Sequence, residues 1–394
     1  MLDCLQDSTL GTARIIAAQL CQKFTKTFTT EISEGNTISL ECYFRQKIYS
    51  TVNYHKGKDL KAKRCILQAF DSVDEDISRP SKVQKKGQYG CAAGQYTPSL
   101  PSNDDDLQLL KIKCSNLIKF YKDGVNVKDD RIMTLMKDTY ALQRHDIVYS
   151  YPCLDDRFFE KWPYLKNYEI LFTHASQLIG VENIQEKWKE VLARHNKPII
   201  EFLEAEERIH VLQSRKKQKI SSDNLFIRNT IHKANSHAIN VSQSNIPLIA
   251  VIFPIIIHFF NEEEKLLYMV VDDTLNDEQI LNVVEYCTPT LVVKGQSLWD
   301  EEATFSIVLN KKCQVQVDEL CNGLLLTFLY YYIYNLSYPQ KLSRTLEFIQ
   351  RFFLLINPPK GSKKTSKSRR SESTDLKTQQ FIADLTEYIH SIPE

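Results

Sequence analysis

The side chains of this chain that could support chemistry are acids, histidines and hydroxyls in short clusters. Val270–Gln279 holds four carboxylates, which could bind a divalent cation if they converged on one loop. A strand end followed by a capped helix start explains the same residues without a metal. His232 and His237 lie five residues apart with no cysteine or third histidine nearby, so a zinc site would need distant ligands. Thr304 and Ser306 have no GxSxG context. These clusters predict no catalytic residue, metal ion or cofactor.

Two other segments bear on a nuclease function. "FTHAS" at 172–176 and "IIEFLEAEE" at 199–207 superficially resemble ribonuclease III, whose metal-bound carboxylates cleave double-stranded RNA. That family requires Gly-Asp after "EFL", whereas Glu204 and Ala205 follow Leu203 here. No second carboxylate cluster at comparable helical spacing is evident, so two-metal chemistry lacks its ligands. A solvated acidic helix face is the simpler interpretation.

Three basic clusters are better candidates for a functional surface. "RKKQK" at 215–219 ends a helix that begins with acidic residues, which suits the helix dipole. Lys82, Lys85 and Lys86 lie in a polar stretch. "KGSKKTSKSRR" at 360–370 lies in polar sequence without apolar periodicity, so its basic side chains have no expected packing role.

The third cluster predicts contact with a nuclear import receptor or with a phosphate backbone. A linker that only improves solubility is the alternative. The candidate contact residues are Lys363, Lys364, Lys367, Arg369 and Arg370. Ser371 follows two arginines and precedes Glu372, which makes it a candidate phosphorylation site. A phosphate there would add roughly two negative charges beside the cluster and weaken either interaction.

Composition places the chain among globular proteins. Its 394 residues are 43% hydrophobic and 25% charged, and suffice for two or three domains of about 100 to 200 residues. The formal net charge is +1, so attraction to nucleic acid or to a membrane must come from local patches. Only 11 glycines are present, which favours helices over tight turns. Ten scattered cysteines without CxxC, and a beginning that does not resemble a secretory signal, predict reduced thiols inside the cell.

Two apolar runs must be weighed as membrane spans. Residues 246–260 are too short for a helical span and contain Pro247 and Pro254. Residues 320–336 carry Asn322 and Gly323, which suits a helix buried on most sides. No membrane partner is therefore predicted.

Hydrophobic periodicity predicts a mainly α-helical α+β protein, in which a helical bundle precedes a small β-containing domain. Strands are predicted in "LLYMVVDDT", "TPTLVVKG" and "ATFSIVLN", and caps at Asp129 and Asp155. The predicted segments are an N-terminal helical segment (1–71), a linker expected to be disordered (72–106), the bundle (107–221), a linker (222–245), the α+β domain (246–357), a basic flexible linker (358–376) and a C-terminal helix (377–394).

The α+β domain is expected to end in an antiparallel helical hairpin. Its two arms, about 317–336 and 340–356, are separated at Pro339, because the residue before a proline avoids the helical region. Facing apolar stripes can be formed by Leu324, Leu325, Phe328, Leu346, Ile349, Phe352 and Phe353. This hairpin is therefore predicted to be core.

Four motifs carry a family resemblance. They are "GQYGC…YTPSLP" (87–101), "IMTLMKDTYALQRHDI" (132–147), "KWPYLKNYEILFTHASQLIG" (161–180) and "YNLSYPQKLSRTLEFIQRFFLLINPPKGSK" (334–363). In this order they resemble a group of uncharacterized animal proteins described as similar to sterile alpha motif domain-containing protein three, over about residues 87–363. Tyr96 stands where members often carry Trp, and residues 1–70 show no pattern of the sterile alpha motif itself. The resemblance implies no enzymatic activity.

These observations favour a non-enzymatic interaction protein of the nucleus, or one shared between nucleus and cytoplasm. Protein partners are expected, with weak nucleic-acid contact through the basic segments as a second possibility. The alternative is a metal-dependent nuclease or other hydrolase whose carboxylates are brought together only by folding. Oligomeric state is not predicted.

Overall fold

The structure, a computed structural model, describes residues 98–151, 156–215, 226–238, 246–311, 313–357 and 375–392, with the backbone alone for 208–215 and 246. The predicted N-terminal segment, most of the linker at 72–106 and the cap at Asp155 lie outside these residues. The described chain is mainly helical with one small sheet. The predicted α+β class is therefore confirmed.

The predicted bundle is a series of helices. They are α3 (Asp104–Lys122), α4 (Asp130–Asp138), α5 (Tyr140–His145), the π turn η1 (Asp146–Ser150), α6 (Asp156–Lys161), the 3-10 turn η2 (Pro163–Lys166), α7 (Tyr168–Ile179) and α8 (Ile184–Arg215). The side chains of Asn103, Asp129 and Asn167 accept backbone N–H groups at the starts of α3, α4 and α7. The prediction of a cap at Asp129 is thus confirmed.

Three further helices precede the sheet. They are α9 (Phe226–His237), α10 (Ile246–Ala250) and α11 (Ile252–Phe260). The prediction of a linker at 222–245 is wrong where α9 forms. Ile227, Ile231 and Ala234 are buried at spacings of four and three, which lets one face of α9 pack although the stretch is polar elsewhere.

The sheet has the order β1 (Tyr268–Val271), β2 (Thr290–Lys294), β3 (Thr304–Leu309) and β4 (Cys313–Val317). The parallel pair β1 and β2 is joined by α12 (Asp277–Val283), while the remaining pairs are antiparallel. The first three strands lie in the predicted strand segments, and β4 is an additional one. Ile280 and Val284 pack with Val292 and Val308 on one face of the sheet.

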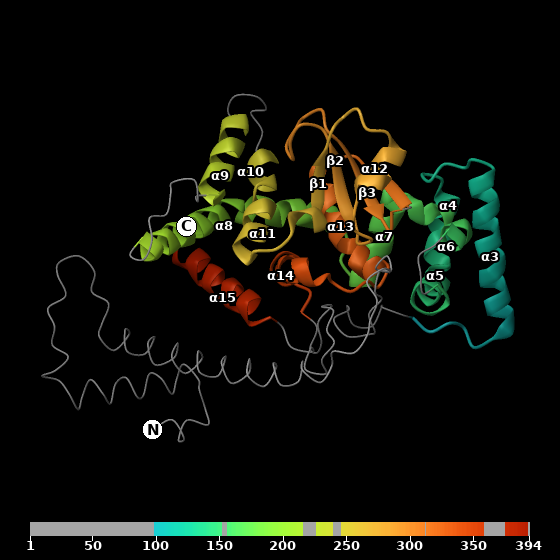
Figure 1. The fold of residues 1–394 in the computed structure, drawn as a ribbon. Helices are drawn as coiled ribbons and strands as arrows, with labels where there is room; N and C mark the ends of the chain where they lie inside the picture. Colours follow the sequence, from blue (N-terminus) through green and yellow to red (C-terminus); the bar gives the residue numbers. More distant parts are fainter. Residues whose placement is uncertain are drawn as a thin grey trace, which may run out of the picture. The chain divides into compact units, whose positions relative to one another are not determined.

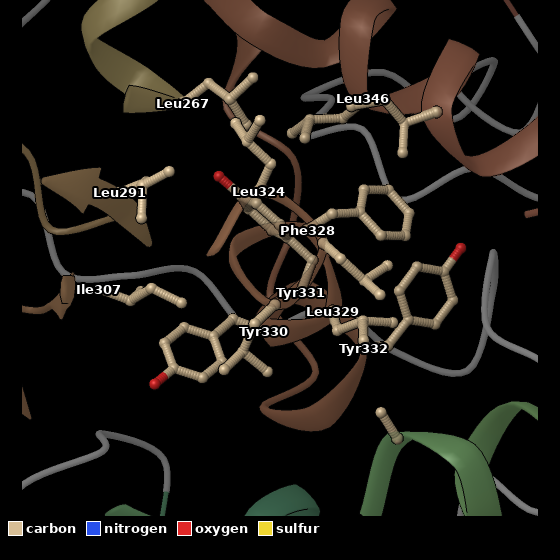
Figure 2. Packing of buried hydrophobic residues seen from close by; sticks show 14 of the residues in the cluster. Leu267, Leu291, Ile307, Leu324, Phe328, Leu329, Tyr330, Tyr331, Tyr332 and Leu346 are labelled. Atoms are coloured by element: carbon tan, nitrogen blue, oxygen red, sulfur yellow. The ribbon is translucent and has the colours of Figure 1, made fainter. Parts of the chain in front are cut away.

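The other face of the sheet packs against α13 (Leu320–Ile333), in which every residue but Cys321 is buried. Figure 2 shows its rings pointing in opposite directions, with Tyr330 towards Ile307 of β3 and Tyr332 away from the sheet. A Cβ added at Gly323 would come within 2.7 Å of Leu291, so glycine permits the close approach of α13 to β2. α13 is the central helix of the core. No helix in the described part of the chain has the length and apolarity of a membrane span.

The two predicted hairpin arms have different bounds and partners from those expected. After α13 come the 3-10 turn η6 (Gln340–Leu342), α14 (Ser343–Phe348), the π turn η7 (Ile349–Phe353) and, later, α15 (Leu376–Ser391). α13 packs mainly on α7 and the sheet, whereas α14 packs on α15 and α11. Of the seven predicted stripe residues, Phe352 is only partly buried and the others are buried.

One hydrophobic core joins the predicted bundle, α+β domain and C-terminal helix. Its buried members run from Cys114 on α3 to Leu385 on α15, and the described residues belong to one compact unit. Figure 1 shows the long α8 extending from the region of the sheet to α9 and α15. These segments are therefore parts of one unit rather than separate domains.

A buried polar network also joins the bundle to α13. Arg144 Nη1 donates to the carbonyl of Ile333 and lies 3.4 Å from His174 Nε2. Gln143 Nε2 donates to Met136 O and Thr139 Oγ1, which leaves Gln143 Oε1 to accept from His174 Nδ1 at 3.1 Å. Nε2 of a neutral His174 then faces the guanidinium as an acceptor. Gln143, Arg144, His174 and the Ile333 carbonyl are called the Arg144 network below.

Candidate functional site

The candidate basic residues Lys363, Lys364, Lys367, Arg369 and Arg370, together with Ser371, lie outside the described residues. The chain on both sides of them is described, up to Asn357 and again from Asp375. The predicted basic linker spans 358–376, but α15 already begins at Leu376. The structure therefore describes the contacts of the residues that flank segment 358–374.

The residues on both sides of this segment contact one helical turn. Arg351 Nη1 donates to Asn357 Oδ1 at 3.2 Å, and the backbone N–H of Asp375 donates to Glu347 Oε2 at 3.4 Å. Glu347 and Arg351 themselves pair at 3.3 Å with i,i+4 spacing. Arg344 Nε completes the group by donating to Asp375 Oδ1 at 3.2 Å. Arg344, Glu347, Arg351, Asn357 and Asp375 are called the segment base below.

The helix that carries the segment base is positioned by α11. Asn261 ends α11 in the left-handed region, and the Glu262 carboxylate then accepts the N–H groups of Arg344 and Thr345, each at 2.8 Å. These bonds satisfy donors at the start of α14 that have no intrahelical partner. Burial raises the pKa of Glu262, although the two backbone N–H groups act in the opposite direction.

The second end of the segment is held by α15. The Asp375 carboxylate accepts from the backbone N–H groups of Lys377 and Thr378 and so caps this helix. Phe381 and Leu385 on α15 are buried in the common core. Segment 358–374 is therefore bounded by packed structure on both sides rather than being part of a free tail.

Exposed leucines border the segment base. The residue Leu355 is 74% exposed and Leu376 is 81% exposed. Leu355 also has a φ of 53°, a left-handed conformation that is uncommon for a leucine. The next residue, Ile356, is buried.

One of the carboxylates that suggested a nuclease has a structural role. Glu207 accepts the N–H groups of Ile227 and Arg228 at the start of α9. His174 of the "FTHAS" motif belongs to the buried Arg144 network, and burial is the main cause that lowers its pKa, followed by the charge of Arg144. The structure does not bring these groups together as a site.

The acidic stretch at 270–279 forms a turn and a helix start. Asp272 accepts from Thr274, and Asn276 forms a capping box with Gln279 at the start of α12. Of the two candidate histidines, both on α9, His232 is exposed and His237 partly buried. Within the described ranges, no group of three or more His, Cys, Asp or Glu side chains is placed to hold a metal ion.

The segment base was not predicted from the sequence, although one signal of it was present. Glu347 and Arg351 have the i,i+4 spacing of a helical ion pair. The contacts of this pair with Asn357 and Asp375 depend on where the chain leaves and returns to the core, which local spacing does not reveal.

Comparison with known proteins returned no match: no family model, no curated protein and no solved structure is significantly similar to this chain. The resemblance to the group named after the sterile alpha motif therefore stays a prediction.

Proposed function

We propose that this chain is a non-enzymatic interaction protein of the nucleus, or of nucleus and cytoplasm, in which the segment base presents the basic cluster at 363–370 to a nuclear import receptor. The observation that carries the proposal is that residues on both sides of segment 358–374 contact the same helical turn. The polar, lysine-rich segment is thus joined to the packed core on both sides. Import receptors bind accessible basic peptides of this kind.

Charge neutralisation at the segment base supports the proposal. Glu347 pairs with Arg351, and Asp375 pairs with Arg344. The acids of the base thus have basic partners within the base.

The test replaces Lys363, Lys364, Lys367, Arg369 and Arg370 by alanine in a fluorescent fusion of the full chain. We expect the melting temperature to stay nearly unchanged while the fusion shifts from nucleus to cytoplasm. A matched control replaces five exposed lysines on α3, α4 and α8 and should leave the distribution as it was; they are Lys111, Lys119, Lys122, Lys137 and Lys187. If the alanine variant and the parent are distributed in the same way between nucleus and cytoplasm, the proposed nuclear localisation is contradicted.

A phosphate on Ser371 is proposed as the regulator of this contact. Because a phosphate adds about two negative charges at neutral pH, Ser371→Asp should move the fusion part of the way to the cytoplasm. Ser371→Ala serves as the control and should behave like the parent.

Weak contact with a phosphate backbone is the second proposed use of the same five residues. Neutralising phosphates releases counterions, so binding of a double-stranded DNA probe should weaken steeply with salt, and the alanine variant should show a smaller slope. The same slope in both proteins would contradict this use. The metal-dependent hydrolase suggested as an alternative is not proposed, because Glu207, Asp272 and His174 are engaged in caps, turns and a buried network.

A further inference from the structure

An open cleft of about 530 Å³ lies between the end of α3 and the start of α7. This volume falls within the range of ~300 to 1,000 Å³ usual for ligand sites. The cleft is lined by Tyr121, Gly124, Val125, Asn126, Val127, Lys128, Tyr164, Asn167, Tyr168 and Glu169. It belongs to the helical half of the protein, and Figure 1 shows α3 on the far side of the molecule from α15.

One wall of the cleft is a supported aromatic surface. The Tyr121 side chain is 49% exposed and packs edge to face against Tyr164, with ring centroids 5.4 Å apart. Tyr164 is buried, and its hydroxyl donates to the carbonyl of Val125 at 3.0 Å. Tyr121 therefore offers an accessible ring on a fixed support.

Carboxylates surround the tyrosine hydroxyls of this cleft. Burial raises the pKa of Tyr168, and the charges of Asp318, Glu169 and Glu319 raise it further. Burial and the charge of Asp129 likewise raise the pKa of Tyr164. Asp129 is paired with Arg131, and Glu319 with Lys189. Glu169 is thus the carboxylate of the lining that an incoming cation can meet.

Lys128, the basic residue in the lining, forms no close ion pair with Glu169 that would exclude an incoming cation. Lys128 Nζ lies 3.9 Å from Glu169 Oε1, which is beyond hydrogen-bonding distance. The Lys128 side chain is 78% exposed, and that of Glu169 is 36% exposed. Because such a surface pair is weak, a ligand can displace Lys128 from Glu169.

We propose that this cleft binds an arginine side chain of a partner polypeptide, with the guanidinium stacked on Tyr121 and paired with the Glu169 carboxylate. Arginine fits better than lysine because its planar guanidinium stacks on aromatic rings and bonds a carboxylate through two N–H groups. The Glu169 carboxylate beside Tyr121 disfavours a phosphate, so a nucleic acid is not the expected occupant. The proposal is independent of the basic segment.

The test measures fluorescence anisotropy of a labelled octapeptide of alternating glycine and arginine titrated with the full chain. We expect Tyr121→Ala and Glu169→Gln each to weaken binding by about tenfold or more, the loss of one stacked or charge-assisted contact. Tyr121→Phe keeps the ring and should retain binding. A peptide with lysine in place of arginine should bind more weakly to the parent.

Matched controls separate the cleft from general electrostatic attraction. Tyr149→Ala removes an exposed tyrosine and Glu278→Gln an exposed acid elsewhere on the surface, and both should bind like the parent. The variant without the five basic residues at 363–370 should also keep its affinity, which distinguishes this site from the proposed nuclear function. Equal binding by the parent, Tyr121→Ala and Glu169→Gln would overturn the proposal.

Discussion

The Arg144 network and the segment base both join distant parts of the chain through an arginine, but they lie in opposite environments. Arg144 and His174 are fully enclosed, and the arginine bonds a backbone carbonyl 189 residues away. At the segment base, Arg344 and Arg351 keep partial contact with water and pair with carboxylates. Polar groups buried in a low dielectric need hydrogen-bond partners within the protein. Interactions between charges near water are instead weakened by solvent and salt. The first network should therefore control global stability, and the second the local attachment of segment 358–374.

The largest expected effect follows from removing the buried arginine. Arg144→Ala leaves a cavity and deprives the Ile333 carbonyl of its donor, so we expect a loss of about 3 to 5 kcal/mol of unfolding free energy. Arg144→Met keeps most of the volume and should lose clearly less. Urea unfolding followed by circular dichroism measures both, and an unchanged midpoint for the alanine variant would show that this network is not a structural element.

A smaller effect is expected at the segment base. Glu347→Ala removes the acceptor of the Asp375 N–H and the partner of Arg351, and because Glu347 is buried the cost should be about 1 to 3 kcal/mol. Glu190→Ala is the matched control, since it breaks an i,i+4 pair with Arg194 that is exposed and should cost about 0.5 kcal/mol or less. Equal losses in the same unfolding assay would mean that burial of Glu347 contributes nothing.

The pH dependence of stability distinguishes the two regions further. The pKa of His174 lies well below 6.5 in the folded protein, so below that pH the unfolded chain takes up a proton that the folded chain does not. Its contribution to stability is thus present above pH 6.5 and falls by about 1.4 kcal/mol for each pH unit below it. The free energy of unfolding should differ less between pH 7 and pH 5.5 for His174→Gln than for the parent. An identical difference would indicate that His174 takes up its proton at the same pH in the folded and unfolded chains.

The smallest effect is expected from the cap of α15. Asp375→Ala removes the acceptor for Lys377 and Thr378 N–H and should cost about 1 kcal/mol. Hydrogen exchange should speed up in α15 while α13 stays protected, because the cap acts locally. Asn103→Ala, which removes the corresponding cap of α3, should leave exchange in α15 unchanged. Faster exchange throughout the core would show that the segment base is not a local element.

Local patterns predicted much of the secondary structure. Three of the four strands, the cap at Asp129 and the apolar helix α13 follow from residues that are neighbours in the sequence. β4 was not predicted, although Cys313, Val315 and Val317 alternate with glutamines and are buried. α9 was also missed, because its apolar face is narrow within a polar stretch. The apolar residues of both segments are buried against the rest of the core.

The sequence by itself determined the fold class, most helix and strand positions and the basic character of the segment at 363–370, because periodicity, caps and charge act over a few residues. The tertiary structure alone decided that Asp375 returns to Glu347, that Arg144 reaches Ile333 and that Tyr121 meets Tyr164 beside Glu169. These contacts join residues far apart in the chain, and they form only because burial of one shared core fixes where each helix ends relative to the others.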